Sequence, residues 1–282
     1  MDITFRTMRS SDIDAGLRLT RAAHWNQLRR DWELFLKHSP DGCWVAEKSG
    51  TVIGTSATIR YQERFSWIGM VLVDPEERGR GTGKELLLRA LEVLSQEACV
   101  RLDATPAGEP LYRKLEFREE CRLSRMEALI PEPASPCSSK ARRVEEADLR
   151  AIGLVDGNAF GADRSFLLNW MWAGAPELAW VLGRGDYVQG YLFGRHGHNF
   201  EHLGPIVATS ADVAGNLVEA ILATLAGKRV IVDASRQAPE WVDRLSSLGF
   251  REQRPFIRMY RGQEARPAQP GLRFAILGPE FG

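Results

Sequence analysis

The feature that most limits the fold of this chain is an internal repeat with a period of 130 to 136 residues. Five landmarks return in the same order: Met8, Asp12 and Ile13 as Val144, Asp148 and Leu149; Trp44-Val45 as Trp180-Val181; Ile68-Gly69 as Leu203-Gly204; Asp103-Ala104-Thr105 as Asp233-Ala234-Ser235; and Phe117-Arg118-Glu119 as Phe250-Arg251-Glu252. Small insertions explain the drift of the period. A duplicated unit of this size predicts two domains with one fold.

The two units are separated by residues 131–139, which are rich in Pro and Ser. Proline cannot continue a helix or a central strand, so this stretch is typical of a linker. We therefore expect a first domain over 1–130, a linker over 131–140 and a second domain over 141–282.

The hydrophobic pattern of the first unit mixes strands and helices, and the second unit repeats the outline. The expected strands cover residues 2–7, 43–47, 51–61, 66–73, 99–104 and 117–129, and the expected helices cover 11–38, 83–96 and 107–115. This order predicts an α/β (α+β layered) fold, in which each domain has a mixed, mostly antiparallel sheet flanked by helices.

The stretch with the clearest chemistry follows the strand over 66–73. Three alternating glycines, Gly79, Gly81 and Gly83, precede a helix with an apolar face. Glycines let backbone N–H groups approach an anion, and the helix adds its unpaired donors and the positive end of its dipole. The pattern predicts a diphosphate cradle, with charge supplied by Arg78, Arg80 and Lys84.

Two other phosphate loops are excluded by spacing. A Walker loop needs Ser or Thr after Gly-Lys, but Glu85 follows Gly83-Lys84. A dinucleotide fingerprint needs G-x-G-x-x-G, whereas this loop has G-x-G-x-G.

With Val73, Pro75 and Arg78 in front of the glycines, the loop resembles the V-x-P-x-x-R-G-x-G-x-G/A signature of the GNAT superfamily of acetyl-CoA-dependent N-acetyltransferases. Leu111-Tyr112 followed by Phe117 resembles the family's L-Y-x-x-x-G-F element, with Glu116 in place of glycine. The resemblance implies that the pantetheine arm of CoA pairs with the backbone of 71–73 and that the loop binds the pyrophosphate. The implied CoA-binding residues are Val71, Leu72, Val73, Arg78, Gly79, Arg80, Gly81, Thr82, Gly83 and Lys84.

The second unit lacks this cradle. The segment after its matching strand, residues 208–216, has one glycine and no arginine, and Asp212 places negative charge where a diphosphate would lie. The position of Tyr112 is expected near residues 241–244. We therefore expect no CoA site there, and the whole chain resembles tandem-GNAT proteins with a degenerate C-terminal domain, whose expected role is structural or in binding the acceptor.

Acyl transfer to an amine needs hydrogen-bond donors that stabilise the oxyanion, an acid that protonates the leaving thiolate and a base that removes the proton of the amine. Backbone N–H groups of 71–73 could stabilise the oxyanion. Tyr112, with a phenol pKa of about 10 against roughly 8.5 for a thiol, is the expected acid. Glu63 is the first candidate base, although an exposed residue in a strand connection would have the same appearance.

The helical region over 11–38 is where this architecture places the acceptor pocket. His24, Trp25, Asn26 and Asp31 are the candidate substrate-binding residues, and core packing is the alternative. His196, His198 and His202 have no spacing of a known metal site, so we expect no metal.

Composition restricts the partners. The 37 basic and 37 acidic side chains give no net charge, so we expect binding neither to nucleic acid nor to a membrane surface. The four cysteines form no C-x-x-C motif, and the charged start is unlike a signal peptide, so we expect a cytoplasmic protein.

These observations predict an acetyl-CoA-dependent N-acetyltransferase that moves an acetyl group directly to a primary amine of a small molecule or peptide. The alternative is a non-catalytic acyl-CoA-binding sensor. A third hypothesis gives the two domains together a larger acyl donor or a macromolecular acceptor.

Overall fold

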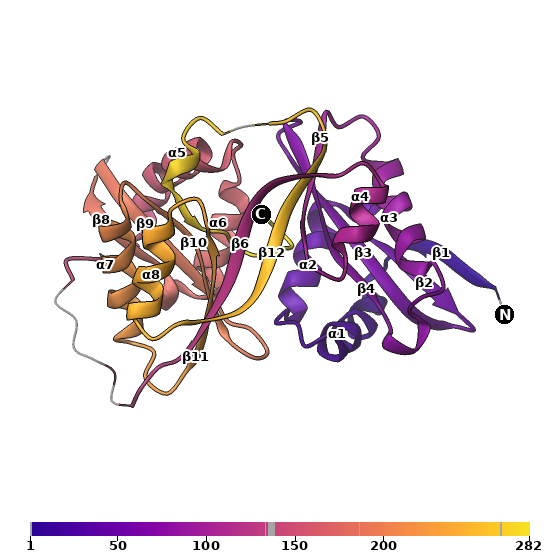
Figure 1. Cartoon of the computed structure of the whole chain (residues 1–282), viewed down its shortest axis with the longest axis horizontal. Coiled ribbons are helices and arrows are strands. Elements are labelled where there is room, and N and C mark those ends of the chain that lie inside the picture. Colours follow the sequence, from indigo (N-terminus) through magenta and orange to yellow (C-terminus); the bar gives the residue numbers. More distant parts are fainter. Residues whose placement is uncertain (1, 133, 135–138, 186, 266) are drawn as a thin grey trace.

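The computed structural model describes residues 2–132, 134, 139–185, 187–265 and 267–282. Its strands form one sheet of 13 strands in the order β1-β2-β3-β4-β5-β12-β6-β11-β13-β10-β9-β8-β7. In Figure 1 the two halves of the sequence lie on either side of the long strands β6 and β12. The predicted α/β fold with a mostly antiparallel sheet and flanking helices is confirmed.

The elements of the first half agree with the predicted ranges to within three residues. They are β1 (Ile3–Thr7), α1 (Ile13–Ala22), α2 (Arg29–His38), β2 (Trp44–Lys48), β3 (Thr51–Tyr61), β4 (Phe65–Val73), α3 (Thr82–Val93), β5 (Cys99–Ala104), α4 (Glu109–Lys114) and β6 (Arg118–Leu129). The helix expected over 11–38 is two helices, because the backbone turns at His24, whose φ is +56°.

The second half repeats this order. It contains β7 (Arg142–Arg143), α5 (Leu149–Phe160), α6 (Ser165–Gly174), β8 (Trp180–Arg184), β9 (Tyr187–Arg195), β10 (Glu201–Ala208), α7 (Ala211–Leu222), β11 (Arg229–Ser235), α8 (Pro239–Ser247), β12 (Arg251–Gly262) and β13 (Arg273–Ala275). Repeat positions hold equivalent contacts: Arg6 pairs with Asp12, and Arg142 pairs with Asp148, each at 2.7 Å.

The two halves exchange their last long strands. β12 of the second half pairs with β5 of the first, and β6 of the first pairs with β11 of the second. Each exchanged strand is held by a buried ion pair at a register position: Arg258 contacts Asp103 at 2.9 Å, and Arg125 contacts Asp233 at 2.7 Å. The division into 1–130, 131–140 and 141–282 stays a prediction, and residues 133 and 135–138 of the expected linker lie outside the described part.

The helices α1, α2, α5 and α6 share one hydrophobic core that joins the halves. Phe35 of α2 stacks on Phe281 with ring centroids 4.9 Å apart, and the guanidinium of Arg30 lies 4.1 Å from the ring centre of Trp170. The halves are therefore connected by a continuous sheet and by a common core.

The segment after β12 connects the two halves again. β13 lies between β10 and β11, where it pairs with both strands. The chain then reaches β3 and β4 of the first half: Tyr61 donates to the carbonyl of Phe281 at 2.7 Å, and Trp67 donates to the carbonyl of Pro279 at 2.9 Å. A Cβ on Gly69 would lie 2.8 Å from the Glu280 carbonyl oxygen, so glycine allows this close approach.

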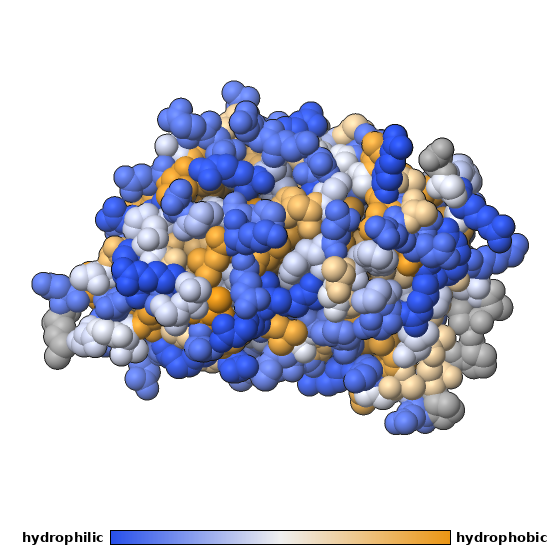
Figure 2. Space-filling view, turned by 180° about the vertical axis from the view of Figure 1, so that it is seen from behind, coloured by the Kyte–Doolittle hydropathy of each residue, from blue (hydrophilic) through white to orange (hydrophobic). Residues whose placement is uncertain are grey.

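The surface is polar over most of the face in Figure 2, with small apolar areas between charged side chains. No helix within the described residues is long and apolar enough to cross a membrane. Cys43, Cys99 and Cys121 are free thiols, and Cys137 lies outside the described residues.

Candidate active site

A gap opens in the sheet between β4 and β5. The two strands pair in parallel only at Ser66 with Val100 and Trp67 with Arg101. Beyond this point β4 contains an irregularity against β3, where Met70 has a φ of +54°. The strands then diverge, and residues 68–71 line a cavity together with Leu102 and Asp103.

The glycine loop lies at the end of β4, in front of α3. Gly79 and Gly81 have φ values of +77° and +86°, and a Cβ at either position would meet no atom within 4 Å. Gly81 is the N-cap of α3 and provides no side-chain cap, so the first N–H groups of the helix remain available. The hydroxyl of Thr82 is buried without a hydrogen-bond partner among the described residues. These features match an anion site built from backbone donors.

The charged residues of the loop are exposed. Arg80 contacts Glu77 at 2.7 Å, and Arg78 donates through Nε to the carbonyl of Val73 at 3.1 Å. Lys84 also lies on the surface. Val71 and Val73 are half-buried and Leu72 is buried, so alternate residues of this strand face the core.

The matching place in the second half is closed. The hydroxyl of Ser210 caps α7 by accepting from the N–H of Val213 at 3.3 Å, and β13 fills the space between β10 and β11. The chain therefore occupies the gap that stays open in the first half.

Tyr112 lies on α4 at the side of the cavity, half-buried. Its ring packs against Phe117 and leaves room at position 108 only for glycine, since a Cβ on Gly108 would approach the ring to 2.8 Å. Burial raises the pKa of Tyr112 to about 12, which keeps the phenol protonated at neutral pH. In the second half Leu245 takes this place, because the Phe250 N–H bonds to the Leu245 carbonyl as the Phe117 N–H bonds to that of Tyr112. Leu245 directly follows residues 241–244, near which the sequence placed this position.

Glu116 follows α4 with a φ of +65°, whereas the second half has Gly249 with a φ of +90°. A left-handed conformation costs a residue with a Cβ about 1–2 kcal/mol. Glycine avoids this cost, but the greater conformational freedom of glycine in the unfolded chain offsets part of the gain. We expect Glu116→Gly to raise the free energy of unfolding by about 0.5–1 kcal/mol in urea denaturation. Glu92→Gly, at an exposed position in the last turn of α3, should instead lower it, by less than the roughly 1 kcal/mol typical of a helix interior. A loss of stability in Glu116→Gly would contradict this explanation.

The cavity, of about 80 Å³, is shared by both halves. Besides β4 and β5, its lining includes Trp25, Asn26, Gln27, Thr105, Tyr112, Arg125, Arg195, His202, Arg254, Phe256, Pro279 and Glu280. The second half contributes to this lining from β9, β10, the exchanged strand β12 and the segment after β13.

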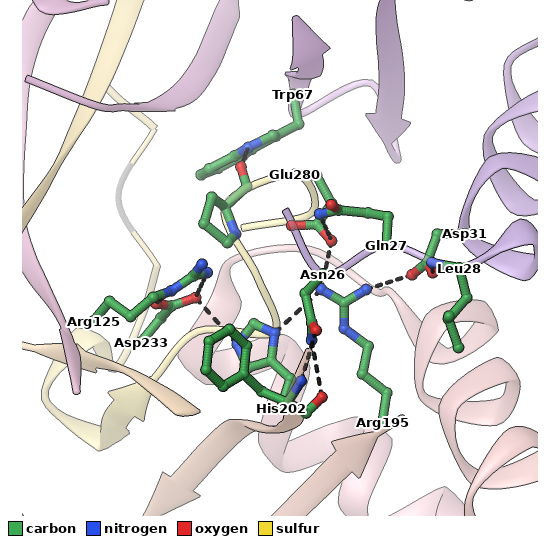
Figure 3. A network of polar contacts seen from close by, with 12 residues as sticks. Asn26, Gln27, Leu28, Asp31, Trp67, Arg125, Arg195, His202, Asp233 and Glu280 are labelled. Carbon is green, nitrogen blue, oxygen red and sulfur yellow. Dashed lines mark hydrogen bonds and ion pairs between the residues drawn. The ribbon is translucent and has the colours of Figure 1, made fainter. Parts of the chain in front are cut away.

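A buried polar network forms one wall of the cavity (Figure 3). Arg195 forms ion pairs with Asp31 and Glu280, and Gln27 donates to Glu280 at 2.9 Å. Burial alone would raise the pKa of Glu280, but the charge of Arg195, together with smaller contributions that include the hydrogen bond from Gln27, outweighs burial and lowers it. Glu280 is therefore ionised at neutral pH.

His202 lies beside this network. Its Nε2 is 3.1 Å from Asp233 Oδ2, and its Nδ1 is 3.3 Å from Arg195 Nη2. Burial lowers the pKa of His202, so the ring is neutral. Because Nδ1 accepts from Arg195, the proton lies on Nε2, which faces Asp233. Both nitrogens of His202 therefore face charged side chains of the network.

The predicted acceptor residues have different surroundings. Trp25 and Asn26 line the cavity, and Asn26 Oδ1 accepts from the N–H groups of Asn199 and Phe200 at 2.9 and 3.0 Å. Asp31 is buried in the ion pair with Arg195. His24 is exposed and does not line the cavity.

Glu63, the predicted base, lies in the exposed turn between β3 and β4, outside the cavity lining. The carboxylates that line the cavity are Asp103 and Glu280. Both oxygens of Asp103 accept from Arg258 at 2.9 Å. The sequence contains no motif around Glu280, Arg195 or Arg254, and only the long-range pairing of strands brings them here.

Two of the histidines considered as metal ligands, His196 and His202, have different surroundings. His196 lies on the surface between Glu177 and Glu201, at 2.8 Å from each, while His202 is buried. Among the described residues, no group of three or more His, Cys, Asp or Glu side chains could hold a metal ion.

The comparison with known families now decides the identity of both halves. Residues 11–117 match the model of the acetyltransferase (GNAT) family, and residues 152–275 match that of an acetyltransferase (GNAT) domain. The chain belongs to the GNAT superfamily. It is a tandem GNAT acyltransferase, as the sequence predicted.

Relatives of this GNAT protein cover both halves. It is 25% identical over 93% of its length to holothin acyltransferase of Pseudoalteromonas sp. (strain SANK 73390), covering 88% of that protein. It is 26% identical to the uncharacterized N-acetyltransferase YitH of Bacillus subtilis (strain 168), over 78% of this chain and 77% of that one.

Solved structures share the fold across both halves. A Pyrococcus horikoshii protein described as an acetyltransferase superposes with a TM-score of 0.81 at 23% identity, over 99% of this chain and 96% of that one. A tandem GNAT protein from the clavulanic acid biosynthesis pathway gives 0.65 at 14% identity, over 94% and 99%.

Proposed function

We propose that this GNAT protein is an acetyl-CoA-dependent N-acetyltransferase that acetylates a primary amine in the first half of the chain. The observation that carries the proposal is the uncapped N-terminus of α3 behind Gly81, at one end of a gap in the sheet that has Tyr112 at its side. An anion cradle and a protonated phenol beside one open gap suit a donor with a diphosphate and a thioester.

The residues present fit such a donor. The open sides of Gly79 and Gly81 leave room for a diphosphate, and the N–H groups at the start of α3 would hold it. The backbone of 71–73 would bind the pantetheine arm in the place where β5 has left β4. Acetyl-CoA supplies an activated acyl group to this site.

The chain's own groups can perform the remaining roles. Tyr112, kept protonated by its raised pKa, donates a proton to the departing thiolate. The N–H groups of 71–73 provide oxyanion donors that need no side chain. Glu280, ionised and lining the cavity, attracts the amine of the acceptor, whereas Glu63, the base expected from the sequence, does not line the cavity.

The second half takes part in the acceptor site and has no donor site of its own. Arg195, His202 and Arg254 line the cavity, while β13 and Ser210 fill the equivalent donor gap. A sensor that binds acyl-CoA without turnover would use the same cradle, so turnover is the decisive property.

Incubation of the full chain with acetyl-CoA and a panel of primary amines tests the proposal. We expect amine-dependent release of CoA thiol, with a product heavier by one acetyl group in mass spectrometry. Saturable acetyl-CoA binding without turnover on any amine would favour the sensor, and turnover only with longer acyl-CoAs would favour a larger donor. Absence of acyl-CoA binding would refute the donor site.

A further inference from the structure

Two arginines face each other on the exchanged strands. Arg254 of β12 is the register partner of Arg125 of β6, and like charges in such a pair destabilise a sheet unless they are compensated. Arg125 is compensated, because both oxygens of Asp233 accept from it at 2.7 and 2.8 Å.

Arg254 has no such partner. Within the described part of the chain, no carboxylate forms an ion pair with it, and its Nε is buried without a hydrogen bond. Asp233, the nearest carboxylate in this register, is already held by Arg125 and by His202. Burial and the charge of Arg125 lower the pKa of Arg254 to about 10, which leaves it a cation at neutral pH.

The repeat gives no structural reason for this arginine. Positions 125 and 258 are equivalent in the two halves, and each arginine has an aspartate partner. The equivalent of Arg254 in the first half is Cys121, which lies opposite Arg258. The pairing of the exchanged strands therefore does not require a cation at the position of Arg254.

Arg254 lines the cavity on the side of the exchanged strands. Its guanidinium lies 4.9 Å from the ring centre of Phe256, and that of Arg125 lies 5.1 Å from the same ring. A flat guanidinium with unused donors suits a carboxylate or phosphate, which it binds through charge-assisted hydrogen bonds.

We infer that Arg254 binds an anionic group, a carboxylate or a phosphate, on the acceptor. This inference rests on the proposed function and names its substrate class: small amines that carry such a group. The amine would lie toward Glu280 and the anionic group toward Arg254. An anionic acyl chain on the donor has the same chemistry, and the experiment separates the two sources.

The first measurement needs no turnover. Thermal unfolding of Arg254→Met should occur at or above the wild-type temperature, because the variant removes an uncompensated cation. A fall of several degrees would show that Arg254 is a structural residue and would overturn the inference. Arg251→Met, an exposed change on the same strand, is the control for expression and handling.

The second measurement is calorimetric binding of matched amines to the CoA-loaded chain. The pairs are O-phosphoethanolamine with ethanolamine, and β-alanine with β-alaninamide. We expect the anionic member to bind at least about 10-fold more tightly, as a charge-assisted hydrogen bond predicts. Arg254→Met should remove this preference, Arg254→Lys should keep part of it, and Arg251→Met should keep all of it. Equal binding of the two members to wild type would overturn the inference.

A donor arm distinguishes the source of the anion. Turnover with succinyl-CoA is compared with turnover with acetyl-CoA, and ethanolamine is the acceptor in both reactions. If Arg254→Met lowered turnover with succinyl-CoA alone, the anionic group would belong to the acyl chain, which would overturn the proposed class of acceptor. Acetyl-CoA binding is measured on the same preparations. Absent binding means that the proposed function fails, whereas normal binding with no anion preference means that only the present inference fails.

Discussion

Replacing Tyr112 with phenylalanine is expected to lower kcat about 100-fold, the size of effect typical of a lost general acid. The phenol lines the cavity and is protonated at neutral pH, so it carries a proton that the departing thiolate can accept. The ring itself fills a place between Gly108 and Phe117, which phenylalanine can also fill. Steady-state release of CoA thiol measures the loss, and acetyl-CoA affinity should change less than about 3-fold.

Tyr187→Phe is the matched control, because Tyr187 is 69% exposed on β9 and lies outside the cavity lining. It should keep wild-type kcat. If Tyr112→Phe retained full kcat at saturating donor and acceptor, Tyr112 could not be the acid.

The second large effect is expected at the anion loop. Gly81→Glu should raise the Kd for acetyl-CoA about 100-fold or more in calorimetry. The new carboxylate would point into open space in front of α3, where a diphosphate would meet its negative charge. The left-handed backbone at φ +86° also strains any residue with a Cβ.

Gly50→Glu separates these causes. Gly50 lies in the turn between β2 and β3 with a φ of +79° and equally open surroundings, so it adds the same charge and the same backbone strain away from the loop. The control should bind acetyl-CoA like wild type. Equal affinities in the two variants would contradict an anion site at residues 78–84.

The duplicated fold could be predicted from the sequence because its signals are local. Glycines 79, 81 and 83, followed by an apolar-faced helix, define the loop without any tertiary information. The same holds for Tyr112, which is placed by its spacing from Phe117. Glu116 could be noticed as a departure from the family pattern, but only the backbone shows that its position is left-handed.

The shared site could not be predicted in the same way. β6 and β12 have equivalent patterns, so nothing local tells each strand to pair with the other half. The carboxylate of Glu280 and the unpaired Arg254 lie far along the chain from the loop and belong to no motif. Their meeting with Tyr112 follows from the strand exchange and from the path of the segment after β13.

The central claim is that one donor site, in the first half, serves a cavity built by both halves. Calorimetric titration of the full wild-type chain with acetyl-CoA tests it most directly. We expect one saturable site per chain, because β13 and the Ser210 cap close the second gap. Two saturable sites per chain would contradict it.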